Sequence, residues 1–409
     1  MKLRLRPVAV ATVGAAATLS AATSAYLLIL LAAAVAAARR TAPSGEPLGG
    51  RPAFVVLVPA HDEVLNIEAA VAALRAQTYT GSSEVIVLAD NCHDRTAELG
   101  AAAGATVWER TEPDERGKGH VLAWALGRLA HERPDIDAVA MVDADCVASP
   151  GLLEAAGARL AAGGQAVQAS YGVSNPDAST TAAGRYAGFA LINHVRPLGK
   201  SALGLSCGLL GSGMAFDSSL LREIPWRSFG VTEDGEYHLK LVERGVRVDF
   251  APEASVVSAM PTTTGGAEVQ RERWEGGQWR LVRDWAWPLV VAGLRDRDLN
   301  RVHAALELLV LPQSLLLAGG VSAAGGAVAL RARRTALVAT AGVAGQIVFV
   351  VGGLVLFGAP ARVYRALALA PALAARNART YARLAARRRP PQWNRTPREA
   401  PAADAPLAR

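Results

Sequence analysis

The sequence has 409 residues and a formal net charge of +7, and 51% of its residues are hydrophobic while 19% are charged. A chain of this length can bury a sizeable core and form more than one structural unit. The excess of arginine lies beside apolar segments, at 39–40, at 331–334 and in the tail. No basic stripe interleaved with aromatic residues occurs between these segments, so we expect no nucleic-acid partner. The three cysteines are far apart, which argues against a disulfide framework or a zinc site.

Three apolar segments predict membrane-spanning helices. Residues 8–38 contain no charged side chain, residues 302–330 are mostly apolar, and residues 336–360 are again uncharged. A spanning helix needs about 20 apolar residues, so each segment can cross a bilayer once. The first segment follows a basic stretch, as a secretory signal does, but it is about twice as long as the ~7–15 apolar residues of a signal. We therefore interpret it as a retained anchor.

The distribution of arginine predicts the orientation in the membrane. Positively charged segments beside membrane spans remain in the cytoplasm and contact anionic lipid. The middle of the chain and the basic tail should therefore be cytoplasmic, with the N-terminus outside. Two basic segments, at 2–6 and 331–334, oppose this topology because it places them outside. We expect a multi-pass protein of the inner cell membrane.

The middle of the chain alternates between two apolar patterns. Short β-branched runs predict strands at 53–60, 84–90, 106–110 and 137–145, and helical spacing predicts helices at 67–77, 94–105 and 119–132. Continuous apolar strands that alternate with helices indicate an α/β domain with a mostly parallel sheet, flanked by helices on both faces. In such sheets the ligand lies outside the carboxyl ends of the strands.

Acidic residues follow three of the predicted strands. Glu63 follows the first strand, Asp90 ends the second, Asp143 and Asp145 end the fourth, and Lys118 opens a helix between them. Each could be only a helix cap. Together they offer oxygen ligands to a divalent cation and a site for a nucleotide diphosphate. The chain has neither the dinucleotide-binding nor the P-loop glycine pattern.

An ordered set of motifs carries a family resemblance. The motifs lie between residues 54 and 274 and read VPAHDE, LADNCHDRT, RGKGHVLAWAL, VDADC, TEDGEYHLKLVERG and QRERW. In this order they resemble the family 2 glycosyltransferases, and more narrowly the membrane-bound branch with cellulose, chitin, hyaluronan and poly-N-acetylglucosamine synthases and ceramide glucosyltransferase. The resemblance implies the nucleotide-diphospho-sugar transferase fold of GT-A type and a single inverting displacement.

The resemblance also implies roles for individual residues. For the donor, it implies uracil and ribose contacts from Pro59, Glu63 and Asp90, with Lys118 nearby. For Mg²⁺ or Mn²⁺ it implies the D-x-D pair Asp143 and Asp145, with Asp145 the direct ligand. The catalytic set would be Glu233, Asp234 as the base, and the Q-x-x-R-W residues Gln270, Arg273 and Trp274. Arg273 would lie near the diphosphate. The acceptor would meet Gly211, Ser212, Gly213 and the ring of Trp274.

Elementary chemistry agrees with these roles. Departure of a diphosphate needs its growing charge neutralised, and the incoming hydroxyl needs a carboxylate to take its proton. Glu233 and Asp234 have a simpler interpretation as first-turn acids of a helix that ends near Gly245. The residues Gly211 to Gly213 could likewise be only a tight turn.

We divide the chain into five segments. They are a basic segment and spanning helix at 1–40, a cytoplasmic catalytic domain at 41–278, an interfacial amphipathic segment at 279–300, two spanning helices at 301–360 and a basic cytoplasmic tail at 361–409. The tryptophans at 279, 285 and 287 suit a membrane interface.

Several functional alternatives stay open. The expected reaction moves a sugar from a nucleotide-diphospho-sugar, with UDP-glucose or UDP-N-acetylglucosamine as donor, to a saccharide or lipid-linked acceptor. Three spans are few for a polymer channel, unless the protein forms an oligomer or has a partner subunit. A non-catalytic protein that binds nucleotide sugars is the alternative from another class. A phosphoacceptor receiver domain would use Asp62, Asp90 and Lys118. It leaves Asp234, the Q-x-x-R-W residues and the membrane spans unexplained.

Overall fold

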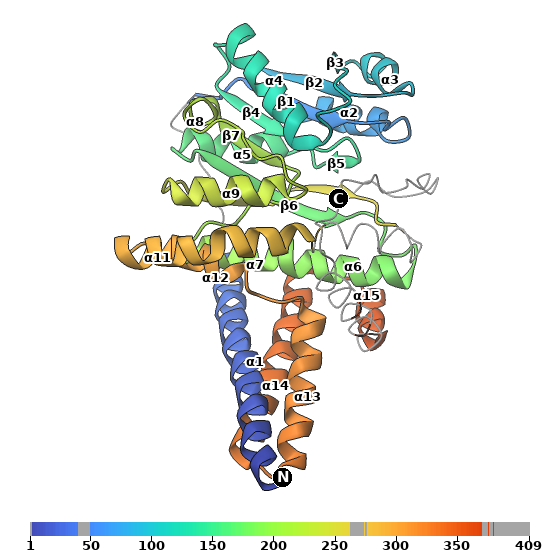
Figure 1. Ribbon diagram of the computed structural model, residues 1–409. Helices are drawn as coiled ribbons and strands as arrows, with labels where there is room; N and C mark the ends of the chain where they lie inside the picture. Colours follow the sequence, from blue (N-terminus) through green and yellow to red (C-terminus); the bar gives the residue numbers. More distant parts are fainter. Residues whose placement is uncertain are drawn as a thin grey trace.

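A computed structural model of the protein describes residues 2–39, 50–261, 274, 276–369, 375 and 379. The molecule has two parts, an α/β domain and a bundle of helices that projects from it (Figure 1). The bundle consists of α1 (Lys2–Ala38), α13 (Gln313–Ala329) and α14 (Arg333–Phe357). The N-terminus lies at the end of the bundle away from the domain (Figure 1).

The first half of the sheet is parallel, as the sequence predicts. Its strands are β1 (Phe54–Ala60), β2 (Ser83–Asp90), β3 (Thr106–Arg110) and β4 (Ala138–Met141), in the order β3-β2-β1-β4. The connecting helices are α2 (Ile67–Arg75), α3 (Thr96–Ala102) and α4 (Lys118–Glu132). The predicted strand at 137–145 ends early, because residues 142–145 turn away after Met141.

The second half of the sheet corrects the prediction of a mostly parallel sheet. It adds β7 (Met214–Asp217), β6 (Ala166–Val173), β8 (Val248–Ser258) and β5 (Cys146–Ala148), which follow β4 in this order. β7 is antiparallel to both β4 and β6, and β5 is antiparallel to β8, so the sheet is mixed. The N–H of Gly213 donates to the carbonyl of Met141 at the carboxyl end of β4. β7 starts at that end, and it must therefore run in the opposite direction.

The two faces of the sheet are buried by different helices. Along β1, Val55 and Leu57 pack on the side of α4, whereas Val56 and Val58 pack on the side of α2 and α5 (Leu152–Ala161). Successive side chains of a strand point to opposite faces, so a strand covered on both sides is apolar throughout. The core on the α4 side also contains Leu27 and Leu31 of α1. The domain and the bundle therefore share one core.

A layer of helices separates the sheet from the bundle (Figure 1). It contains the continuous helical stretch α6 (Thr180–Ala190), η1 (Leu191–Val195) and α7 (Arg196–Ala202), in which η1 is a π-helical turn. The layer also holds α11 (Trp287–Asp296), preceded by the π-turn η2 (Val282–Ala286), and α12 (Leu299–Glu307). Nearer the sheet lie α8 (Ser218–Glu223) and α9 (Glu233–Glu243). π-Turns inside α-helices occur frequently at functional sites.

The apolar segment 302–330 is divided rather than continuous. Its first residues belong to α12, and the chain is not helical from 310 to 312, before α13 begins. Glu307 forms ion pairs with Arg196 at 2.7 Å and Lys200 at 2.8 Å, which fasten α12 to α7. Among the described residues, two helices are long and apolar enough to cross a membrane, residues 6–38 and 333–357, and α13 is a shorter apolar helix of 17 residues.

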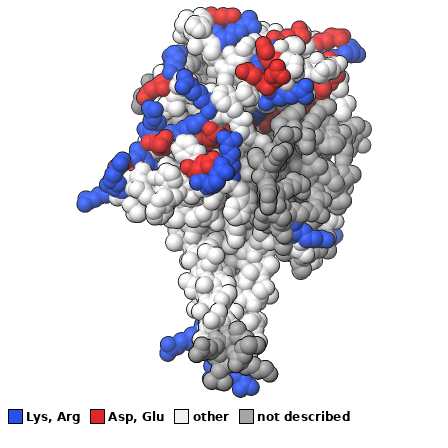
Figure 2. Space-filling model, in the orientation of Figure 1, with Lys and Arg blue, Asp and Glu red and all other residues white. Residues whose placement is uncertain are grey.

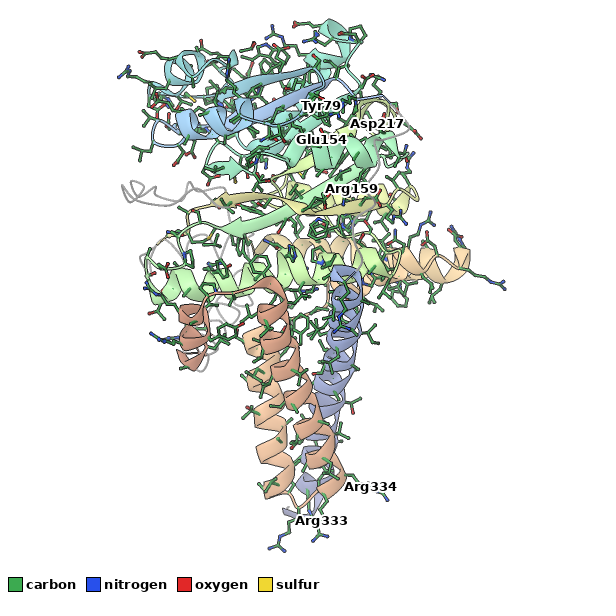
Figure 3. The ribbon with its side chains drawn as sticks, turned by 180° about the vertical axis from the view of Figure 1, so that it is seen from behind. Tyr79, Glu154, Arg159, Asp217, Arg333 and Arg334 are labelled. Atoms are coloured by element: carbon green, nitrogen blue, oxygen red, sulfur yellow. The ribbon has the colours of Figure 1, made fainter. Side chains whose placement is uncertain are left out.

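The bundle is packed through small residues. Ser24 Oγ donates to the carbonyl of Gly342 at 2.7 Å, and a Cβ added at Gly342 would lie 2.9 Å from Ser20 Oγ. A Cβ at Gly199 of α7 would collide with the carbonyl oxygen of Leu30. Small residues allow such close approach between helix backbones. The shaft of the bundle carries no charge on the face in Figure 2 until its tip, where Figure 3 shows Arg333 and Arg334.

Candidate active site

A cavity of about 900 Å³ lies between the sheet and the bundle. We call one part of it the carboxylate end, which is lined by residues that follow the strands or begin helices: Pro59, Glu63, Asp90, Lys118, Asp143, Asp145, Glu233 and Asp234. We call the other part the apolar end, which is lined by η1, α13 and α14 through Leu191, Ile192, Leu317, Ile347, Val350 and Val351. The predicted donor and base residues thus share one cavity.

Two carboxylates stand at the ends of neighbouring strands. Glu63 is buried, and its Oε2 accepts a hydrogen bond from Asn66 Nδ2 at 2.9 Å. Asp90 is also buried and forms an ion pair with Arg110 at 2.8 Å. Asp90 and Arg110 are register partners, as the last residues of β2 and β3. The pair satisfies a buried charge, which would otherwise be costly.

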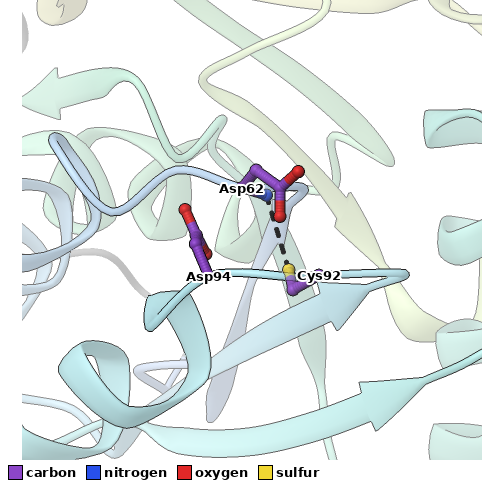
Figure 4. Close-up of side chains that lie close together, drawn as sticks. All are labelled: Asp62, Cys92 and Asp94. Atoms are coloured by element: carbon purple, nitrogen blue, oxygen red, sulfur yellow. Dashed lines mark hydrogen bonds between the residues drawn. The ribbon is translucent and has the colours of Figure 1, made fainter.

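The loops after β1 and β2 are fastened to each other by Asp62, Cys92 and Asp94 (Figure 4). The N–H of Asp62 points to Cys92 Sγ at 3.5 Å, and Asp62 Oδ1 accepts from the N–H of His93 at 2.7 Å. Asp94 accepts from two backbone N–H groups. The ligand atoms of the three residues lie within 4.8 Å of one another, but burial raises the pKa of Cys92 to about 11. A protonated thiol is a poor metal ligand, so we interpret the group as a support for the loops.

Lys118 connects the acidic residues of the carboxylate end. Its Nζ lies 2.5 Å from Asp143 Oδ1 and 3.9 Å from Glu233 Oε1, and it donates to the carbonyl of Gly211. Burial disfavours the charged ammonium, but the negative charges of Asp143 and Glu233 outweigh burial and raise the pKa of Lys118. The site therefore holds a fixed positive charge beside at least two carboxylates.

Asp143 and Asp145 have the composition of a divalent-cation site. Their ligand atoms and that of Cys146 lie within 4.8 Å of one another. Cys146 is buried, and burial raises the pKa of its thiol well above the usual value. The two partly exposed carboxylates remain as the oxygen donors, the kind that Mg²⁺ and Mn²⁺ prefer. The residues present fit such an ion.

Glu233 and Asp234 form the first turn of α9. Burial, followed by the charge of Asp234, raises the pKa of Glu233. Burial also raises the pKa of Asp234, although the nearby ammonium of Lys118 opposes this rise. Both residues line the cavity, so they are more than helix-dipole acids. Glu233 is buried and Asp234 half-buried, and such a carboxylate pair next to a cation is suited to general-base chemistry.

The glycines of the loop before β7 allow a close approach to Asp234. Gly211 and Gly213 have φ angles of +88° and +70°, which favour glycine. A Cβ at Gly211 would lie 3.3 Å from Asp234 Oδ2. Ser212 is buried, and its Oγ accepts from the N–H of Asp143 at 3.0 Å. Of these three residues only Gly211 lines the cavity, whereas Ser212 supports the backbone of Asp143.

Trp274 lies on the wall between the two ends of the cavity. The guanidinium of Arg185 lies 5.3 Å from the centre of its ring, and the ring of Phe189 lies 5.9 Å away. The helical residues that follow Trp274 pack on the loop before α9, where a Cβ at Gly277 would collide with the side chain of Thr232. Gln270 and Arg273, the other predicted members of this motif, lie outside the described residues.

Sequence reasoning missed several residues of the cavity. It also missed Arg110, which does not line the cavity but pairs with Asp90, although its place at the end of β3, beside Asp90 in register, was a usable signal. Arg185 and Asn193 come from α6 and η1, for which the sequence offered no motif. Gln313 and Gln346 are amide side chains in otherwise mostly apolar helices. Polar residues in membrane-type helices indicate functional positions, which was the missed signal here.

Comparisons with known proteins agree with this geometry. Residues 52–277 match the model of the glycosyltransferase-like family 2. No curated protein matched the sequence. Among solved structures, a mannosyltransferase from Pyrobaculum calidifontis in complex with GDP-Man and Mn²⁺ is 20% identical, with a TM-score of 0.50 over 82% of this chain and 98% of that chain.

A second solved structure, glucosyl-3-phosphoglycerate synthase from Mycobacterium tuberculosis, is also 20% identical, with a TM-score of 0.38 over 54% of this chain and 76% of that chain. The family match and the similarity to the mannosyltransferase identify the domain as a GT-A nucleotide-sugar transferase fold with a mixed sheet. The chain belongs to the glycosyltransferase-like family 2 and is a glycosyltransferase.

Proposed function

We propose that the protein is a membrane-bound, inverting glycosyltransferase. It moves a sugar from a nucleotide-diphospho-sugar, with UDP-glucose or UDP-N-acetylglucosamine as the expected donor, to a hydroxyl of a saccharide or lipid-linked acceptor. The observation that carries this proposal is the convergence of Lys118, Asp143, Asp145, Glu233 and Asp234 at one end of one cavity. Such a group combines a metal-type carboxylate pair, a cation and a buried carboxylate base.

The donor would occupy the carboxylate end. Pro59, Glu63 and Asp90 would contact the base and ribose. They line the cavity at or just after the carboxyl ends of β1 and β2, which is where ligands of such sheets bind. Asp143 and Asp145 would hold Mg²⁺ or Mn²⁺, which when bound neutralises charge on the leaving diphosphate. The Lys118 ammonium, 2.5 Å from Asp143, adds a second positive charge.

Asp234 would take the proton of the acceptor hydroxyl. It lies against Gly211, where a side chain would crowd its carboxylate. Burial raises the pKa of Asp234, which strengthens it as a base, while the nearby Lys118 favours its ionised form. Trp274 would stack against the acceptor or the transferred sugar. For Gln270 and Arg273 we retain the roles that the family resemblance implies.

We further propose that α1, α13 and α14 cross the membrane, with the domain and the basic tail in the cytoplasm. α14 has 25 residues, which at 1.5 Å per residue gives about 37 Å, enough for a hydrocarbon core of about 30 Å. The uncharged shaft in Figure 2 supports this placement. Arg333 and Arg334 at the far tip oppose it under the positive-inside rule (Figure 3). We expect a thiol reagent that does not cross the membrane to label Arg334→Cys in intact cells and Glu154→Cys only after lysis. The reverse pattern would overturn the topology.

The test of the reaction uses membranes that contain the full chain. Radiolabelled UDP-glucose, UDP-N-acetylglucosamine and GDP-mannose are supplied with Mg²⁺ or Mn²⁺, and transfer and free-sugar release are measured. We expect turnover of one UDP-sugar that stops with a chelator and in Asp145→Asn. Turnover of GDP-mannose alone would overturn the donor assignment. No turnover of any donor, with retained binding of nucleotide sugar, would support a binding protein instead.

A further inference from the structure

The cavity does not end at the carboxylates. From Asp234 it continues past Trp274 and η1 into the space beside α13 and α14. Gln346, the residue of α14 that lines it farthest from the domain, lies about three turns before the end of the helix at Phe357, or about 16 Å along the axis. If the bundle crosses a membrane, this depth is about half of the ~30 Å hydrocarbon core.

The apolar end opens sideways and not through the bundle. Ile347 and Val351 line it and are 50% and 42% exposed, so they form its edge on the outer surface of α14. Among the described residues, none of α1, and none of the halves of α13 and α14 farther from the domain, lines the cavity. A growing polysaccharide would need a path to the far end of the bundle. The cavity instead has the shape of a pocket entered from the bilayer.

The lining of the apolar end suits hydrocarbon with a few polar groups. Leu191, Ile192, Leu317 and Val350 offer no hydrogen bonds to sugar hydroxyls, which are costly to bury without partners. Two side-chain atoms on the wall are buried and have no hydrogen-bond partner among the described residues: Gln313 Nε2 and Gln346 Oε1. Gln346 is fully buried, with its Nε2 donating to Ser20 Oγ. Buried polar atoms normally have partners, so these two indicate a ligand with its own polar groups.

We propose, on the basis of the proposed function, that the acceptor is a membrane lipid whose head carries the accepting hydroxyl. Its hydrocarbon chain occupies the apolar end, its linkage region meets Gln313 and Gln346, and its head reaches Asp234. The acceptor oxygen bonds to the anomeric carbon of the donor, the bond from that carbon to the diphosphate oxygen breaks, and the diphosphate leaves with the electron pair. The hydroxyl proton moves to the Asp234 carboxylate.

The test separates transfer to lipid from turnover of the donor. Membranes with the full chain receive the radiolabelled donor, and products are divided into an organic-solvent extract, an insoluble polymer fraction and free sugar. We expect label in the organic extract, in a product stable to mild acid as expected for a glycoside and not for a sugar phosphate. Label in polymer alone, or only in an acid-labile lipid product, overturns the proposal. Absence of all turnover, including free sugar, would instead count against the proposed function.

Variants of α14 locate the lipid. Val350→Trp fills the apolar end and should lower the lipid product about tenfold or more, while free-sugar release from the donor persists. Ile347→Trp should also lower the lipid product. Because Ile347 is at the exposed edge of the cavity, a larger side chain there should not disturb folding. The matched control is Val348→Trp, because Val348 is 55% exposed on the same helix and does not line the cavity. Equal lipid product in all three variants and the unaltered protein would overturn the placement.

Discussion

The two ends of the cavity are built in different ways. The carboxylate end stands on the ends of parallel strands, and its chemistry is carried by charged side chains. The apolar end is formed by η1 and, more than 100 residues later in the chain, by α13 and α14, and these elements contribute mostly aliphatic side chains. Charged groups at strand ends can be recognised from the sequence alone, whereas the shape of an apolar pocket depends on packing. On our proposals, the first end accounts for the reaction type and the second for the choice of acceptor.

The largest effect is expected at the carboxylate end, from Asp234→Asn. Loss of a positioned general base typically lowers the rate by about 10²–10⁴-fold. Binding of the donor should remain, because Asp234 is proposed to act on the acceptor. The measurements are initial rates of transfer and equilibrium binding of labelled nucleotide. Glu243→Gln is the matched control, since Glu243 is exposed on the same helix. A greater loss in Glu233→Gln than in Asp234→Asn would move the base to Glu233.

The ion pairs of Glu307, which connect α12 to α7, should affect the stability of the fold and not the transfer reaction. Glu307→Gln leaves the charges of Arg196 and Lys200 buried without a carboxylate, which should lower the free energy of unfolding by about 3–5 kcal/mol. The exposed pair of Arg128 and Glu132 gives the control, because Glu132→Gln should cost less than about 1 kcal/mol. Unfolding of the detergent-solubilised protein measures both. Similar losses of unfolding free energy in the two variants would show that the ion pairs of Glu307 stabilise the fold no more than an exposed pair.

The stabilisation by Glu307 also has a defined pH dependence. Burial disfavours its ionisation, but the charges of Lys200 and Arg196 outweigh burial and hold the pKa of Glu307 well below its usual range. A carboxyl group whose pKa is lower in the folded state stabilises the fold at pH values above its unfolded pKa of about 4.3. This stabilisation is lost as the pH falls from there towards the folded pKa. The difference in free energy of unfolding between the unaltered protein and Glu307→Gln should therefore have its full value at neutral pH and decrease only below about pH 4.

The same contrast explains what the sequence could predict. Asp90 and Asp143 were found because apolar strands end just before them, and parallel strands bring their ends together. The antiparallel β7 was missed because its direction depends on where Gly213 meets β4, a contact between segments about 70 residues apart. Ile192 could not be assigned to a pocket, since an isoleucine in a helix has the same pattern whether it faces a core or a ligand.

Arg110 tests whether the carboxylate end depends on a residue without a motif. Arg110→Met leaves Asp90 buried and unpaired, and the cost of such an unsatisfied group is about 1–3 kcal/mol. We expect the KM for the donor to rise about tenfold, with a smaller change in kcat, because Asp90 is proposed to contact the nucleotide. Arg95→Met is the control, since Arg95 forms an exposed pair with Glu98. An unchanged KM would remove Asp90 from the donor site.

The smallest effect is expected on the surface of α11. Trp287 and Leu294 are 73% and 67% exposed and lie two turns apart on one face of the helix, as an interfacial helix requires. Because α1, α13 and α14 would still anchor the protein, Trp287→Ser should change the transfer rate by less than about twofold. A sharper measurement is the depth of each side chain in the bilayer, read from a spin label attached to an introduced cysteine. A label at Leu294→Cys should be reached by oxygen dissolved in the bilayer, and a label at the exposed position of Arg283→Cys by a water-soluble quencher. If both labels are equally accessible from water, α11 does not lie on the membrane, and only the bundle of α1, α13 and α14 would hold the protein there.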